Sequence, residues 1–82
     1  MADLTQLEYF RTVANLQHIT RAAEELHISQ PNLSNAIKRL EQSLEVKLFD
    51  RRNGRVFLNA YGKVFLSGVN DAFASLAAAE KK

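Results

Sequence analysis

The 82-residue sequence contains no cysteine, no tryptophan, one proline and three glycines. Without cysteine there is no disulfide framework, no thiolate metal ligand and no thiol nucleophile. No apolar run approaches the ~20 residues that a helix needs to cross a bilayer. The opening residues, Met-Ala-Asp-Leu, also lack the basic-then-apolar profile of a secretory signal. These absences predict a cytoplasmic chain with no membrane partner.

What is present suits one small domain. Apolar side chains make up 46% of the sequence, enough for a single core. Because so short a chain folds alone only marginally, a second copy or a bound partner would stabilise it.

The positive charge is concentrated in the middle of the chain. Residues 30–63 hold seven Lys and Arg against three Asp and Glu, a net charge of +4, whereas residues 1–29 carry −2 and residues 64–82 are neutral. A localised basic patch favours a polyanionic partner. An ordinary solvated face is the alternative that charge alone leaves open.

Apolar spacing predicts two helices in the first third of the chain. Residues 3–16 repeat Leu and Phe at helical intervals, and Asp3 followed by Gln6 resembles a capping box. Residues 20–26 form a shorter helix with a small-residue face, for which Thr20 is the expected N-cap.

A third helix begins at Ser29, the expected cap, with Pro31 in its first turn, where proline is tolerated. Apolar residues recur every three or four positions as far as Leu44, while the opposite face is polar and carries positive charge. Two short helices joined by a tight turn predict a helix-turn-helix over about residues 19–38.

A basic hairpin and a long helix complete the sequence. Residues 46–52 and 55–58 read as two short strands around Asn53-Gly54, a strong hairpin-turn dipeptide. With three arginines the hairpin, about 46–58, would form a wing. Asn59 then caps a helix over residues 60–82, whose apolar seam has a roughly heptad period.

The combined pattern resembles the LysR-type transcriptional regulators. The resemblance is carried by Leu4-xx-Leu-xx-Phe10, Thr20-Arg-Ala-Ala-xx-Leu26, Ser29-Gln-Pro-x-Leu-Ser34, Leu40-Glu41 and Leu48-Phe-x-Arg51. It implies a mainly α fold, with a winged helix-turn-helix over residues 2–59 and a linker or dimerisation helix over residues 60–82.

The resemblance also implies a function. A homodimer would bind double-stranded DNA at an inverted repeat, with the third helix in the major groove and the wing in the minor groove. A larger C-terminal effector-binding domain is absent from these 82 residues, and a small-molecule inducer would bind there. No cofactor is therefore expected within residues 1–82.

Three positions depart from the family pattern. Asn35 stands where Arg is common, and its amide suits the N6/N7 edge of adenine, not guanine. Glu45 stands where Gly usually ends the recognition helix, at a cost of about 1 kcal/mol if the backbone there is left-handed. Asn59 replaces the usual Thr before the last helix, although Asn caps equally well.

The DNA-binding residues expected from this docking lie on both helices of the helix-turn-helix and on the wing. Asn35 is the first choice for reading bases, and Arg52 is the first choice for the minor groove. The full set is Thr20, Gln30, Pro31, Asn32, Ser34, Asn35, Lys38, Arg39, Arg51, Arg52 and Arg55.

Some of these roles have alternatives. Thr20 could be only a cap, and Pro31 could shape the first turn without touching a thymine methyl. Arg51 could pair with an acid such as Glu41, and Arg55 could be either a phosphate contact or a solvated strand residue. A protein-interaction module is the rival function, although a basic wing and an amide-rich helix face disfavour it.

Dimerisation is expected through the last helix, at Phe65, Val69, Ala72, Phe73 and Leu76. No catalytic residue is expected, because Ser34 lacks a positioned His and acid. No metal site is expected, because the two histidines stand apart from any acidic cluster at ligand spacing.

Overall fold

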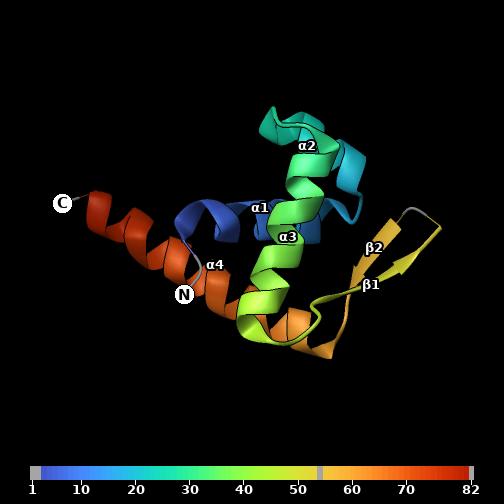
Figure 1. Cartoon of the computed structure of the whole chain (residues 1–82). Coiled ribbons are helices and arrows are strands. Elements are labelled where there is room, and N and C mark those ends of the chain that lie inside the picture. Colours follow the sequence, from blue (N-terminus) through green and yellow to red (C-terminus); the bar gives the residue numbers. More distant parts are fainter. Residues whose placement is uncertain (1–2, 54, 82) are drawn as a thin grey trace.

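A computed structural model describes residues 3–53 and 55–81. Three helices, α1 (Leu4–Leu16), α2 (Ile19–Leu26) and α3 (Gln30–Leu44), pack together and are followed by the strands β1 (Phe49–Arg52) and β2 (Arg55–Leu58). The long helix α4 (Ala60–Glu80) runs back along α1 and ends on the side opposite the hairpin (Figure 1). The fold is therefore mainly helical, as the sequence predicts.

Three of the predicted caps are confirmed. The side chains of Asp3, Ser29 and Asn59 accept hydrogen bonds from the backbone N–H of Gln6, Asn32 and Gly62 respectively. Each bond satisfies an amide that has no partner inside its helix, so these caps fix where α1, α3 and α4 begin.

The predicted cap of α2 is wrong. The N-cap is His18, whose Nδ1 accepts from the N–H of Arg21 at 3.2 Å, so α2 begins one residue before Thr20. An unprotonated imidazole nitrogen can accept as a Ser or Thr oxygen does. Thr20 lies within the helix instead, and its hydroxyl is free for another partner.

The hairpin forms where the sequence predicts it, but its first strand is shorter. Phe49 pairs with Leu58 and Arg52 with Arg55, on either side of the dipeptide predicted as the turn. Asn53 has a positive φ of 51°, whereas Gly54 lies outside the described residues. The strand predicted from residue 46 begins only at Phe49, because Leu48 N donates to the Glu41 carboxylate instead of to a strand.

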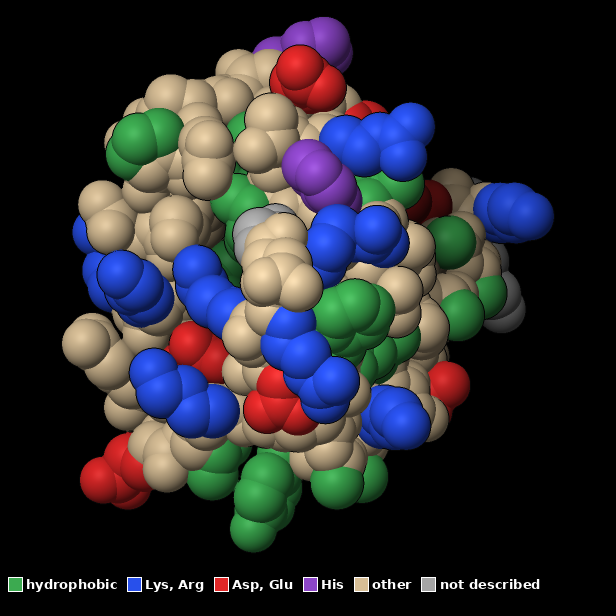
Figure 2. Space-filling model, turned by 90° about the vertical axis from the view of Figure 1, so that its right-hand side faces the viewer, with side chains coloured by type: hydrophobic (Ala, Val, Ile, Leu, Met, Phe, Trp, Pro, Cys, Tyr) green, Lys and Arg blue, Asp and Glu red, His purple; other side chains and the backbone are tan. Residues whose placement is uncertain are grey.

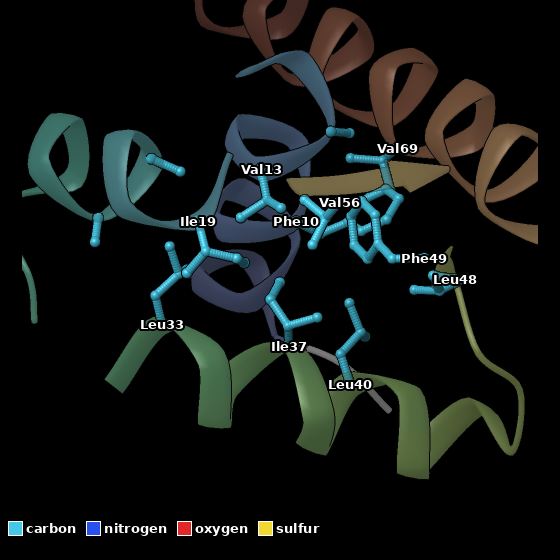
Figure 3. Packing of buried hydrophobic residues seen from close by; sticks show 13 residues of the cluster. Phe10, Val13, Ile19, Leu33, Ile37, Leu40, Leu48, Phe49, Val56 and Val69 are labelled. Atoms are coloured by element: carbon cyan, nitrogen blue, oxygen red, sulfur yellow. The ribbon is translucent and has the colours of Figure 1, made fainter. Parts of the chain in front are cut away.

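The core lies where the four helices α1 to α4 and the hairpin meet (Figure 3). Phe10 is at its centre, with its ring centroid 5.4 Å from that of Phe49 and 5.1 Å from that of Phe65. Leu33, Ile37 and Leu40 contribute the inward face of α3, as their spacing predicts. This packing leaves the opposite face of α3 to solvent.

Hydrogen bonds tie α3, the hairpin and α4 together at a junction formed by Glu41, Lys47, Leu48, Asn59 and Gly62. Glu41 Oε2 accepts from Leu48 N at 2.7 Å, and Leu48 O accepts from Asn59 N at 3.0 Å. Asn59 Nδ2 also donates to Lys47 O at 2.8 Å, and Asn59 Oδ1 accepts from Gly62 N. The junction therefore fixes the angle between the wing and α3.

The backbone of Glu45, at the end of α3, is left-handed, with φ 59° and ψ 29°. This is the condition under which the sequence predicts a cost for a residue other than glycine. Its N–H bonds back to the carbonyl groups of Gln42 and Glu41. A non-glycine residue is strained in this region of the backbone map, so Glu45 carries the predicted cost.

Candidate nucleic-acid interface

The first turns of α3 present a polar, solvent-exposed face. Its exposed members are Gln30, Pro31, Asn32, Asn35, Lys38 and Arg39, and Ser34 is half-buried. The face is exposed because Leu33, Ala36 and Ile37 take the inward positions of the same helix. Amide groups there can both donate to and accept from base edges, and the two cations can meet phosphates.

The wing brings Arg51, Arg52 and Arg55 to the surface, all three exposed. Arg55 has a defined structural contact, since its Nε donates to the carbonyl oxygen of Gln17 at 3.0 Å. Val56 N donates to the same oxygen at 3.4 Å, and His18 forms a β-bridge with Arg55. Arg55 therefore tethers the wing to the turn between α1 and α2.

A basic groove of about 470 Å³ separates α3 from the wing. Lys38, Lys47, Arg51 and Arg52 line it together with Glu41, Phe49 and Asp50. Figure 2, which looks from the wing side, shows Lys and Arg side chains spread over this face, with acidic groups between some of them. A groove with four cations in its wall is suited to a phosphate backbone.

Lys47 is a residue that the sequence reasoning missed. It lies in neither a helix nor a strand, and only its place within the basic middle third of the chain pointed to it. The junction holds its backbone carbonyl, and its side chain lines the basic groove beside Lys38. Folding thus places it in the groove wall.

Thr20 and Glu41 have hydrogen-bond partners other than those considered from the sequence. Thr20 is exposed, and its Oγ1 donates to Gln30 Oε1 at 3.4 Å across the helix-turn-helix. Glu41, the suggested partner of Arg51, is 7% exposed and bonds to Leu48 N, while Arg51 is exposed to solvent.

The residues expected at a dimer contact fall in different places on α4. Val69 is 4% exposed and belongs to the core of its own chain. Phe65 packs on Phe10, and Phe73 lies 4.0 Å under the guanidinium of Arg11. Ala72 and Leu76 are exposed.

An apolar groove of about 410 Å³ runs between α1, α3 and α4. It is lined by Leu7, Ser43, Leu44, Val64, Phe65, Gly68, Val69 and Ala72. Val64 is 76% exposed, and the groove continues toward Tyr61, itself 66% exposed. These are large apolar areas to leave in water.

Within residues 3–53 and 55–81, no three His, Asp or Glu side chains form a group that could hold a metal ion. In the same part of the chain, no helix combines the length and apolar character that crossing a membrane requires.

A helix-turn-helix followed by a basic hairpin defines a winged helix-turn-helix. Residues 4–63 match the lysR family of bacterial regulatory helix-turn-helix proteins. The chain therefore belongs to the LysR family, as the DNA-binding domain of a transcriptional regulator and not an enzyme.

Individual relatives agree with this assignment. The uncharacterised HTH-type transcriptional regulator YybE of Bacillus subtilis is 55% identical over 64 residues, which are 78% of this chain and 22% of YybE. The hca operon transcriptional activator HcaR of Escherichia coli is 46% identical over 78 residues, 95% of this chain and 25% of HcaR. The chain thus spans a quarter or less of these curated relatives.

Solved structures agree as well. The DNA-binding domain of CbnR in a DNA complex matches with a TM-score of 0.91 at 30% identity, over 98% of this chain and 92% of the other. The BenM domain bound to benA site 1 DNA gives 0.92 at 30% identity, covering 98% and 93%. The predicted fold and family are confirmed.

Proposed function

We propose that the domain binds a specific double-stranded DNA sequence as a dimer on an inverted repeat, within a transcription regulator in the bacterial cytoplasm. The observation that carries this proposal is the arrangement of the polar face of α3 and the arginine-bearing wing on either side of the basic groove. The CbnR and BenM domains share this architecture in complexes with DNA.

The roles follow from the geometry. The first turns of α3 would enter the major groove, where Asn35 reads a base and its neighbours contact edges or phosphates. Arg52, which pairs with Arg55 next to the hairpin turn, would enter the minor groove. Lys38 and Lys47 would hold the backbone strand that crosses the basic groove.

Selection of bound duplexes from a random pool, followed by salt titration of the best sequence, tests this function. Asn35→Ala should relax preference at one base pair, where a good amide contact is worth about 1–3 kcal/mol. Arg52→Ala should lower affinity for all sequences or reduce A/T preference beside the half-site, and should flatten the salt slope by about 1 if it meets a phosphate.

Lys81→Ala is the matched control, since it removes one exposed positive charge at the far end of α4. It should change the salt slope by much less than Arg52→Ala. Site selection that enriches nothing, with weak binding in all variants, would favour the protein-interaction alternative.

The dimer contact is proposed at the apolar groove and at the exposed Ala72 and Leu76 of α4. Gly68 supports this placement, because a Cβ built there meets nothing within 4 Å in its own chain. A glycine inside a helix costs up to about 1 kcal/mol relative to alanine, and close approach of another backbone is a reason to retain it.

Sedimentation equilibrium tests the contact. Val64→Asp places a charge in the groove at a position already exposed in the monomer, so the fold should survive and the dimer should dissociate. Ser67→Asp adds the same charge at an exposed position outside the groove and should leave association intact. Equal behaviour of the two variants would place the dimer contact elsewhere.

A further inference from the structure

Thr20 and Gln30 join the two helices of the helix-turn-helix on their exposed side. Thr20 is the second residue of α2 and Gln30 is the first residue of α3, and the Thr20 Oγ1 to Gln30 Oε1 distance is 3.4 Å. Both side chains are exposed, beside the face proposed to meet DNA.

The contact has only one chemical direction. An amide oxygen has no proton, so the Thr20 hydroxyl donates and Gln30 Oε1 accepts. The Gln30 Nε2 group then carries the two hydrogens that the pair presents to a ligand. A glutamine that reads adenine uses both atoms, accepting from N6 with its oxygen and donating to N7 with its nitrogen.

We infer that Thr20 is a positioning residue that turns the Gln30 amide so that it reads a hydrogen-bond acceptor in the major groove. Oε1 accepts from Thr20 with one of its two lone pairs, so reading adenine would require the other lone pair to meet N6 while Nε2 meets N7. Because the contact holds Oε1 toward Thr20, the matching edges are acceptors that Nε2 can reach alone, namely N7 and O6 of guanine or O4 of thymine. This inference rests on the proposed docking of α3 in the major groove.

Neither side chain is needed for capping, which leaves both available for this contact. His18 caps α2, although Thr20 is the residue type usual at that position. Ser29 caps α3, so the side chain of Gln30 is not required by the orphan amides of that helix. The Thr20 side chain is also β-branched, which restricts the directions its hydroxyl can take.

Site selection with the wild type and three variants tests the inference. Thr20→Val keeps the branched shape and removes the hydroxyl, whereas Thr20→Ser keeps the hydroxyl. Gln30→Ala identifies the base pair that this side chain reads. The wild type and Thr20→Ser should both prefer guanine or thymine there, and Thr20→Val should gain at least about fivefold in relative affinity for adenine, within the range of one bidentate contact.

The outcomes separate this inference from the proposed function. An unchanged preference in Thr20→Val, or a wild-type preference for adenine at that base pair, overturns the role of Thr20 while DNA reading stands. Uniform weakening on all sequences with a flatter salt slope also overturns it, because Thr20 would then be a phosphate contact. Failure of the wild type to enrich any sequence overturns the proposed function itself.

Nuclear magnetic resonance of the free domain tests directly whether the Thr20 and Gln30 side chains are coupled. In the free domain, the side-chain amide resonances of Gln30 should shift in Thr20→Val and return in Thr20→Ser, while those of Gln6 stay in place. Gln30 resonances that do not respond to either variant would show that the two side chains are not coupled. Because Thr20 is exposed, both variants should fold.

Discussion

The junction, which includes Gly62 in the first turn of α4, and the outer half of α4, residues 70–80, differ in how many contacts hold them to the rest of the chain. At the junction Leu48 and Asn59 are hydrogen-bonded to each other, Leu48 also bonds to Glu41 of α3, and Asn59 also bonds to Lys47 and to the buried Gly62 of α4. Over residues 70–80 every side chain is exposed except the half-buried Phe73. The junction is fixed by hydrogen bonds within its own chain, whereas the outer half of α4 leaves most of its side chains exposed to solvent.

This difference separates two tasks. The junction sets the position of the wing relative to α3, so changes there should unfold the domain or misplace the wing. The outer half of α4 contributes little to the fold, so changes there should act on contacts with other chains. Four substitutions, each compared with a second variant, test how sharp that division is.

Gly62→Ala should have the largest effect. A Cβ at this position would overlap the Leu48 carbonyl oxygen and lie 2.7 Å from Leu58 Cδ2. Because a backbone atom cannot yield as a flexible side chain can, we expect a loss of about 3 kcal/mol in the free energy of unfolding. Urea denaturation measures it.

Gly68→Ala is the control on the same helix. With nothing within 4 Å of the new Cβ, it should stabilise the monomer by up to about 1 kcal/mol. Equal effects of the two alanines would remove the distinction between the junction and the rest of α4.

Glu41→Ala should come next, with a loss of about 2 kcal/mol. The substitution deletes the acceptor of the Leu48 N–H, and a buried amide without a partner costs about 1–3 kcal/mol. Glu41→Gln keeps an acceptor oxygen and should lose about half as much in thermal unfolding. If Gln and Ala are equally destabilising, the hydrogen bond is not what Glu41 contributes.

Asn59→Ala should cost about 1 kcal/mol, typical for loss of an N-cap. It removes both the bond to Gly62 N and the bond to Lys47 O. Asn59→Asp keeps the cap and loses only the donor, so comparing the two in urea separates the capping of α4 from its tie to the wing. An Asp variant as unstable as the Ala variant would show that the Lys47 bond, and not the cap, accounts for the loss.

Glu45→Gly should give the smallest effect, a gain of up to about 1 kcal/mol. Glycine adopts the left-handed backbone at φ 59° without steric cost. Glu25→Gly, inside α2 at an exposed position, should instead destabilise the domain. If Glu45→Gly lowers the stability measured by thermal unfolding, the Glu45 side chain stabilises the domain by more than its backbone strain destabilises it.

Most of the fold could be predicted from the sequence. The caps Asp3, Ser29 and Asn59 act on amides three residues away, and the apolar spacing of α3 selects its buried face within one helix. The hairpin register follows from a two-residue turn between two short strands. Such short-range rules also gave the exposed polar face that includes Asn35.

The rest depended on partners far away in the chain. Thr20 and His18 are both plausible caps by type, and only packing decides which one reaches the free amides of α2. Because Leu48 N bonds to Glu41, β1 begins only after Leu48. The Arg55 side chain donates to the carbonyl oxygen of Gln17, which lies 38 positions earlier in the chain. Lys47 lines the basic groove because its carbonyl oxygen is bonded to Asn59, which is 12 positions later in the chain.

By itself, the sequence determined the order of the helices and strands, three of the caps and the polar face of α3. The tertiary structure decided the partner of Thr20, the tether at Arg55, the intolerance of Gly62 and the apolar face that α4 leaves uncovered. Caps and periodicities act within a few residues, where side-chain type is sufficient. Contacts between distant segments depend on which surfaces the packed core brings together, which no single segment encodes.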